Sequence, residues 1–153
     1  LVHRKLRSVM DYGLSVILCV GESLDDRRHD RTEALLTRQL DTALADILQD
    51  NTASLIIAYE PVWAIGTGET ASPEQAQDAA GFVRDWLSDR FGALVAQSTR
   101  VLYGGSVKPG NASTLQSQPD LDGMLVGGAS LEPDSFLQII DAVIDAAGRE
   151  ASC

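Results

Sequence analysis

A glutamate stands where a strand-like run ends and a glycine-containing loop begins. Glu60 follows the apolar run Leu55–Tyr59, and Pro61 separates it from Gly66 and Gly68. A carboxylate at such a point can take up a proton, while glycines let backbone N–H groups approach a ligand closely. The arrangement predicts a general base beside a hinged lid. For Glu60 considered alone, a solvated glutamate in a flexible loop is the preferred alternative.

Two further segments place small residues after strand-like runs. Gly104 and Gly105 precede Ser106, and Gly127 and Gly128 follow another apolar run. Backbone donors at such glycines can bind an anion, and barrels of parallel strands often bind phosphate at the loops after their last two strands. One glycine pair is weak evidence, because tight turns use glycine for geometry alone. Two pairs in successive units predict a phosphate site.

These residues need parallel strands to position them. Apolar runs of strand length alternate with helical patterns, and each run ends in Gly, Ser or Glu without a hairpin turn. Nearly all residues of the runs are apolar, as in a parallel sheet covered on both faces. The sequence therefore predicts an α/β fold with four parallel strands. The expected strands are residues 16–20, 55–59, 101–103 and 124–126.

Helices are expected between these strands. Apolar residues from 35 to 48 share one helical stripe, which packing against the sheet explains. Ser72 and Gln75 can form a capping box, and Pro133 opens the last helix, which Gly148 is expected to end. Counting a helix before the first strand, five helices accompany four strands. Four strands would leave two open edges, so half a barrel is the simplest interpretation.

Charge and composition exclude several classes of function. The net charge of -10 argues against general binding to nucleic acid, and an anionic ligand would need local backbone donors. Because no apolar run approaches the roughly 18 residues of a membrane span, and residues 1–7 show no signal-like region, we expect a cytoplasmic protein without membrane contact. Cys19 and Cys153 show no metal-ligand spacing. Cys19 is expected to be a buried, reduced thiol.

Three strings resemble the signature segments of triose-phosphate isomerase, in that family's order and spacing. They are Tyr59–Gly68, Tyr103–Val107 and Leu125–Leu131, and Cys19–Glu22 resembles a fourth. The resemblance extends over essentially the whole chain. It implies that residues 1–153 form the C-terminal half of a single (β/α)8 TIM barrel domain, whose N-terminal half is absent from the sequence. Because no initiator methionine opens the chain, a processed or truncated product is expected.

The resemblance also implies an activity and its residues. The family interconverts dihydroxyacetone phosphate and glyceraldehyde 3-phosphate, in glycolysis and gluconeogenesis, through an enediol or enediolate and without cofactor or metal. Glu60 matches the catalytic base. The groups that hold the substrate phosphate are matched by Gly66, Ser106, Gly127 and Gly128.

Other matched positions concern the lid and the missing half. Trp63 matches an indole at the lid root that a carboxylate matching Glu22 binds, although core packing explains both residues nearly as well. The family's asparagine, lysine, electrophilic histidine and second glutamate, and the loop that docks into a second subunit, have no counterparts here. His3 and His29 are expected to be solvated, and Glu69 stands where many members have lysine. A homodimer is therefore implied only for the intact protein.

Two alternatives to an isomerase remain open. One is another phosphate-handling barrel enzyme, which should lack the string from Glu60 to Gly68. The other is a non-catalytic half-barrel that serves as a phosphate-binding or self-associating module. The chain alone is expected to be inactive, and either to self-associate through its open edges or to fail to pack its lid.

Overall fold

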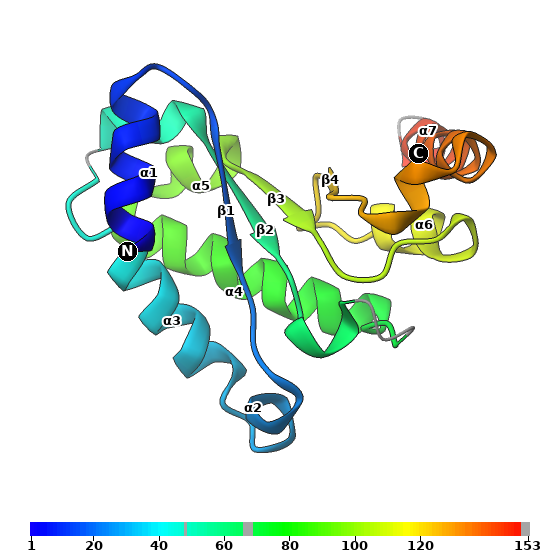
Figure 1. The fold of residues 1–153 in the computed structure, drawn as a ribbon, viewed down its shortest axis with the longest axis horizontal. Coiled ribbons are helices and arrows are strands. Elements are labelled where there is room, and N and C mark those ends of the chain that lie inside the picture. Colours follow the sequence, from blue (N-terminus) through cyan, green and yellow to red (C-terminus); the bar gives the residue numbers. More distant parts are fainter. Residues whose placement is uncertain (48, 66–68, 151–153) are drawn as a thin grey trace.

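Four parallel strands form one sheet in the computed structural model, which describes residues 1–47, 49–65 and 69–150 (Figure 1). Each strand pairs with the next along the chain, in the order β1-β2-β3-β4. Parallel neighbours need crossover connections, and helices occupy each connection. The predicted α/β fold with four parallel strands is confirmed. The strands are β1 (Val16–Val20), β2 (Leu55–Tyr59), β3 (Arg100–Tyr103) and β4 (Gly123–Met124).

Two strands differ from the prediction at their ends. β3 begins at Arg100, one residue earlier than predicted, and β4 is shorter than the predicted 124–126. Leu125 still donates a backbone hydrogen bond to the Tyr103 carbonyl oxygen at 2.9 Å. The backbone then leaves the extended conformation at Gly127, where φ is -87° and ψ is -115°. The apolar character of this run predicted its burial but not where its ladder ends.

Seven α-helices and three short 3-10 turns lie in the described part of the chain. The short helices α2 and α5 were not predicted, because each adds little more than one turn beside a longer helix. The helices are α1 (Val2–Asp11), α2 (Leu24–Arg28), α3 (Thr32–Ala43), α4 (Pro73–Phe91), α5 (Ala93–Ser98), α6 (Pro109–Gln116) and α7 (Pro133–Glu150). The 3-10 turns are η1 (Gln49–Ser54), η2 (Val62–Ala64) and η3 (Gly128–Leu131).

The helix ends follow the capping signals in one case and depart from them in another. Ser72 and Gln75 form the predicted capping box of α4, since each side chain bonds the backbone N–H of the other residue. The predicted end of α7 at Gly148 is wrong, because the helix continues to Glu150. Gly148 is absent from the described glycines that have positive φ, so it does not form the left-handed cap that ends many helices.

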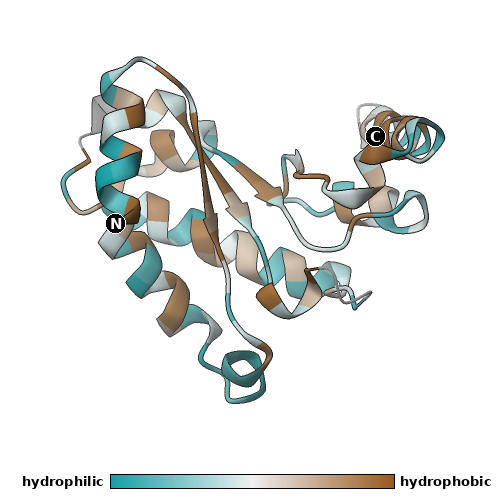
Figure 2. Cartoon of the chain, in the orientation of Figure 1, coloured by the Kyte–Doolittle hydropathy of each residue, from teal (hydrophilic) through white to brown (hydrophobic). Residues whose placement is uncertain are grey.

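The core lies between the sheet and its covering helices. Leu36 and Leu40 of α3 are fully buried, as are Val83 and Leu87 of α4. These side chains belong to one cluster with the inward-facing strand residues, among them Ile57. Figure 2 shows the long strands as hydrophobic segments of the ribbon. Burial of this aliphatic surface holds the strand ends, and therefore the candidate site, in place.

At β1, only one of the two faces of the sheet is covered. Leu18 and Val20 are buried, whereas Ile17 is 45% exposed and Cys19 is exposed. Successive residues of a strand point to opposite faces, so this alternation identifies an open face. The expectation of a sheet covered on both faces is wrong at this strand. The predicted burial of Cys19 fails for the same reason, since no second layer lies on that side within the described residues.

The outer parts of the molecule are exposed and partly apolar. Within the described chain, β1 and β4 each pair along one edge only. In Figure 1, α6 and α7 lie together at one end of the molecule, opposite α1 and α3. α7 exposes 57% of Leu137 and 62% of Ile144. Among the described helices, none combines the length and the apolar composition that crossing a bilayer requires.

Candidate active site

Glu60 is the first residue after β2, and its backbone continues the sheet pairing. Its N–H donates to the Val20 carbonyl oxygen at 2.7 Å, and Gly104 N–H donates to the Tyr59 carbonyl oxygen at 2.8 Å. The Glu60 side chain extends beside Gly104, where an added Cβ would lie 2.5 Å from Glu60 Cγ and 3.0 Å from Oε1. Only glycine leaves room for the carboxylate there. Glu60 is partly buried, which disfavours the alternative of a freely solvated glutamate.

Cys19 of β1 lies next to the Glu60 carboxylate on the open face of the sheet. Partial burial of the sulfur, the negative charge of Glu60 and a hydrogen bond to it raise the pKa of the Cys19 thiol to about 11. All three causes act against forming a thiolate. Cys19 is therefore a neutral neighbour of Glu60 near pH 7. Sequence reasoning missed this contact, because it depends on the register of β1 and β2, in which Cys19 pairs with Ala58, two residues before Glu60.

The buried carboxylate of Glu22 collects hydrogen bonds at the root of the predicted lid. Glu22 is fully buried, and its Oε1 accepts from the Tyr59 hydroxyl at 2.9 Å and from Trp63 Nε1 at 3.1 Å. Arg27 Nη1 lies 3.5 Å from the same oxygen. The sequence-predicted pair of Glu22 and Trp63 is thus in contact, and its role as lid support stays a prediction. Burial and the Glu22 charge raise the pKa of Tyr59 far above its ordinary value.

The far end of the loop is also attached to the sheet. Ala71 N–H donates to the Tyr103 hydroxyl at 3.2 Å, where Tyr103 is the last residue of β3. An added Cβ on Gly105 would lie 2.2 Å from that hydroxyl oxygen, so Gly105 makes room for Tyr103. Gly66, a predicted phosphate-binding residue, lies outside the described residues. The loop is therefore anchored at Trp63 on one side and at Ala71 on the other.

A cavity of about 290 Å³ lies between the lid root and the loops after β3 and β4. Ser106, Gly127 and Gly128 all line it, and their role in binding phosphate stays a prediction. Gly104 lines this cavity and also contacts the Glu60 side chain, so the carboxylate and the cavity share a wall. The complete lining is Ala64, Ile65, Gly104, Gly105, Ser106, Val107, Lys108, Gly127, Gly128 and Ala129.

Two residues of this region were missed by sequence reasoning. Lys108 lines the cavity and is one of only two lysines in the chain. Asn111 Nδ2 donates to the Ser106 carbonyl oxygen at 2.9 Å, and Lys108 N–H donates to Asn111 Oδ1 at 2.7 Å. The Asn111 amide therefore fixes the loop that carries Ser106. The signal was present in the asparagine placed two residues after Pro109, the first residue of α6.

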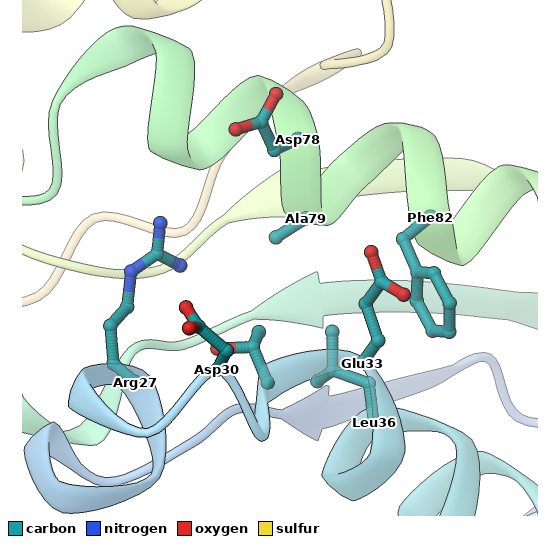
Figure 3. Close-up of a pocket in the computed structure, with 8 residues that line it drawn as sticks. Arg27, Asp30, Glu33, Leu36, Asp78, Ala79 and Phe82 are labelled. Carbon is teal, nitrogen blue, oxygen red and sulfur yellow. The ribbon is translucent and has the colours of Figure 1, made fainter.

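A second cavity, of about 420 Å³, is separate from Glu60 and the glycine loops. Figure 3 shows it between α2 and α3 on one side and α4 on the other, with Arg27 among acidic side chains. Within the described residues, no group of three or more His, Cys, Asp or Glu side chains could hold a metal ion. The lining of this second cavity comprises Arg27, Asp30, Thr32, Glu33, Leu36, Asp78, Ala79 and Phe82.

The histidines lie apart from this arrangement. His3 Nδ1 lies 3.0 Å from the Ala43 carbonyl oxygen, and its side chain is 24% exposed. The prediction that His3 is solvated is wrong, because α1 packs the imidazole against the end of α3. The side chain of His29 is 59% exposed, as predicted, and its Nδ1 lies 2.7 Å from the Asp25 carbonyl oxygen.

Known proteins resemble this chain along most of its length. A family model described as triosephosphate isomerase matches residues 1–143. The triosephosphate isomerase of Syntrophotalea carbinolica is 50% identical over 139 residues, which cover 91% of this chain and 55% of that protein. The triosephosphate isomerase of Geobacter metallireducens is 49% identical over 140 residues, which cover 92% of this chain and 56% of that protein. That from Emericella nidulans is 45% identical over 141 residues, covering 92% and 56%.

The chain spans about half the length of these curated relatives. The matched residues include the strand ends that carry Glu60 and both glycine loops. A different family of phosphate-handling barrel enzymes is not supported by this match. The four parallel strands agree with an α/β fold of the TIM type. On its sequence and its fold, this chain belongs to the triosephosphate isomerase family.

Proposed function

We propose that this chain is the C-terminal half of a triose-phosphate isomerase, the part that carries the catalytic base and the phosphate site. One observation carries the proposal: the Glu60 carboxylate shares Gly104 with a cavity lined by Ser106 and glycines. A proton acceptor at one end of a cavity and neutral anion donors at the other suit a small phosphorylated carbon acid. The names of the relatives favour an enzyme over a non-catalytic binding module.

The proposed reaction moves one proton between neighbouring carbons. Glu60 removes the proton beside the substrate carbonyl, and an enediol or enediolate forms. A second proton passes from the hydroxyl oxygen to the former carbonyl oxygen, by way of the group that polarises the carbonyl. The protonated Glu60 then returns its proton to the adjacent carbon, which converts dihydroxyacetone phosphate to glyceraldehyde 3-phosphate. The transfer is internal to enzyme and substrate, so it uses no redox cofactor. The group that polarises the carbonyl would come from outside residues 1–153, because neither His3 nor His29 lies near Glu60.

The phosphate is held by donors that carry little charge. Ser106 supplies a hydroxyl, and Gly127 and Gly128 can present backbone N–H groups to an anion. Gly66 belongs to the same proposed set. Such donors suit a chain whose net charge of -10 repels anions at long range. The phosphate would fix the substrate so that its reacting carbons face Glu60.

The loop after Glu60 would act as the lid. Trp63, before the proposed lid, donates to Glu22, and Ala71, after it, donates to Tyr103. Closing over the cavity excludes water, which makes the carboxylate more basic and protects the reactive intermediate. The intact protein is proposed to be a cytoplasmic homodimer of glycolysis and gluconeogenesis, binding neither nucleic acid nor membranes.

Complementation tests this function. Residues 1–153 are mixed with a separately made N-terminal part of the Syntrophotalea carbinolica relative, and isomerase activity is followed in a coupled assay. We expect no activity from residues 1–153 alone and partial recovery in the mixture. Glu60→Gln in the mixture should lower turnover by orders of magnitude while inhibitor binding at the phosphate site persists. Near-normal turnover with Glu60→Gln would refute the base, and a fully active monomer of residues 1–153 would refute the half-barrel.

A further inference from the structure

A single side chain satisfies both backbone polar groups of Gly21, the residue that follows β1. Gly21 N–H donates to Gln39 Oε1 at 2.9 Å, and Gln39 Nε2 donates to the Gly21 carbonyl oxygen at 2.9 Å. Gln39 lies on α3 and is partly buried, while Gly21 is buried. The neighbouring residues Val20 and Glu22 accept backbone hydrogen bonds from Glu60 and Val62, whereas the Gly21 N–H and carbonyl groups are paired by the Gln39 amide. Each lost bond would leave a buried peptide group unpaired.

Gly21 in turn contacts the backbone of Glu60. A Cβ added to Gly21 would lie 1.8 Å from the Glu60 carbonyl oxygen, 2.5 Å from its carbonyl carbon and 3.2 Å from the Pro61 nitrogen. The two peptide segments therefore pack directly against each other, and no side chain larger than hydrogen fits between them. A displacement of Gly21 would displace the peptide that carries Glu60. The carboxylate of Glu60 is confined on its other side by Gly104.

We propose that Gln39 is a positioning residue for Glu60. It fixes the Gly21 peptide with two hydrogen bonds, and the Gly21 peptide fixes the main chain of Glu60. The carboxylate then keeps its place beside Gly104 and Cys19. The inference rests on the proposed function only in that Glu60 is the base whose position matters. Catalysis by a carboxylate requires its placement to within a fraction of an ångström, which gives this support its importance.

The Cys19 thiol can report the position of the Glu60 carboxylate without any need for activity. The thiolate is the form that alkylates, so the rate of alkylation near pH 8.5 follows the thiolate fraction. The ratio of the Cys19 rates in Glu60→Gln and in the unaltered chain measures the effect of the carboxylate on the thiol. Peptide mass spectrometry separates Cys19 from Cys153. Taking a ratio removes changes in accessibility that affect both proteins equally.

The same ratio is then measured in the Gln39→Met background, as the Cys19 rate with Glu60→Gln divided by the rate without it. Gln39→Met removes both hydrogen bonds to Gly21 and adds no charge. The matched control is Gln77→Met on α4, because Gln77 also makes two hydrogen bonds, both to Asp120, and does not contact Glu60. We expect the ratio to fall to roughly half or less with Gln39→Met and to stay unchanged with Gln77→Met. An unchanged ratio with Gln39→Met would overturn the proposal, even if both variants lower stability alike.

A second variant covers the case in which Gln39→Met does not fold. Gln39→Glu keeps an acceptor for Gly21 N–H but sets a carboxylate oxygen against the Gly21 carbonyl oxygen in place of a donor, so a fall in the ratio is expected here as well. No fall with this variant would also overturn the proposal. The outcome is independent of the proposed function: if Glu60→Gln keeps isomerase activity in the complementation assay, the base is wrong, while the thiol ratio still decides whether Gln39 positions residue 60.

Discussion

At the scale of single residues, two glycines make room for the proposed base and a third for the attachment of the loop that follows it. Gly21 leaves room for the Glu60 peptide, Gly104 for its carboxylate, and Gly105 for the Tyr103 hydroxyl that anchors Ala71. The sequence predicted glycines as donors to phosphate. Their contacts show that the first pair also serves packing, since each of Gly104 and Gly105 has a side chain where a Cβ would stand. Among the described residues, no heavy atom lies within 4 Å of an added Cβ at Gly127 or Gly128, so side-chain packing does not account for these two glycines.

Lys108 offers a test of how charge reaches the phosphate site. It lines the cavity, whereas Lys5, the other lysine, lies on α1. We expect Lys108→Gln to weaken binding of inorganic phosphate by roughly twofold to fivefold at low salt, and the difference to shrink as salt screens it. Lys5→Gln makes the same change in net charge and should have little effect. Titration of both variants by NMR would decide, and equal weakening would assign the effect to net charge alone.

At the scale of elements, the sequence predicted the strands better than their surroundings. β1 and β2 have their predicted bounds because their apolar runs are bordered by residues that leave the ladder. β4 was misplaced because hydrophobicity does not reveal where the backbone turns at Gly127. The open face at Cys19, the cavity lining by Lys108 and the contact of Gly21 with Glu60 depend on neighbouring strands. Such contacts between distant segments follow from the register of the sheet, which periodicity within one segment does not contain.

The capping box of α4 provides a prediction on the stability of one element. α4 starts a few residues after the lid, and the Ser72 side chain accepts a hydrogen bond from Gln75 N–H. Ser72→Ala should lower the free energy of unfolding by about 1 kcal/mol, measured by urea denaturation. Ser88→Ala in the last turn of the same helix, away from the N-terminal cap, is the control and should be neutral or slightly stabilising, because alanine is the better helix former. Equal effects from the two changes would argue against a role for the cap.

At the scale of the whole molecule, the helix count indicates what would cover the open edges. In the described chain, five helices flank four strands when the short α2 and α5 are set aside: α1, α3, α4, α6 and α7. A closed eight-stranded barrel has one outer helix per strand. Two copies of this chain would bring ten such helices to eight strands, whereas a complement of four strands and three helices would bring eight. This count supports the proposal that the intact protein covers these edges with a complementary segment and not with a second copy.

The whole molecule should also lose stability at alkaline pH. The folded state raises the pKa of Cys19 from 9.0 to about 11 and raises those of Tyr59 and Tyr103. Between about pH 9 and pH 11 the unfolded chain therefore binds fewer protons than the folded chain. Because stability changes with pH in proportion to that difference, the free energy of unfolding falls as pH rises through this window and is fully retained below it.

Urea denaturation at pH 7, 9 and 10 would measure this fall, with Tyr59→Phe as the informative variant. Phenylalanine cannot ionise, so we expect the decline between pH 9 and pH 10 to become shallower, even though the lost bond to Glu22 lowers stability at every pH. Tyr12→Phe is the control, since Tyr12 is 83% exposed and losing that phenol should leave the slope as it was. If the slope were the same in all three proteins, proton release from the buried Tyr59 hydroxyl would not be the cause. Stability that rose with pH would contradict the sign itself, and with it the burial of this hydroxyl against the Glu22 carboxylate.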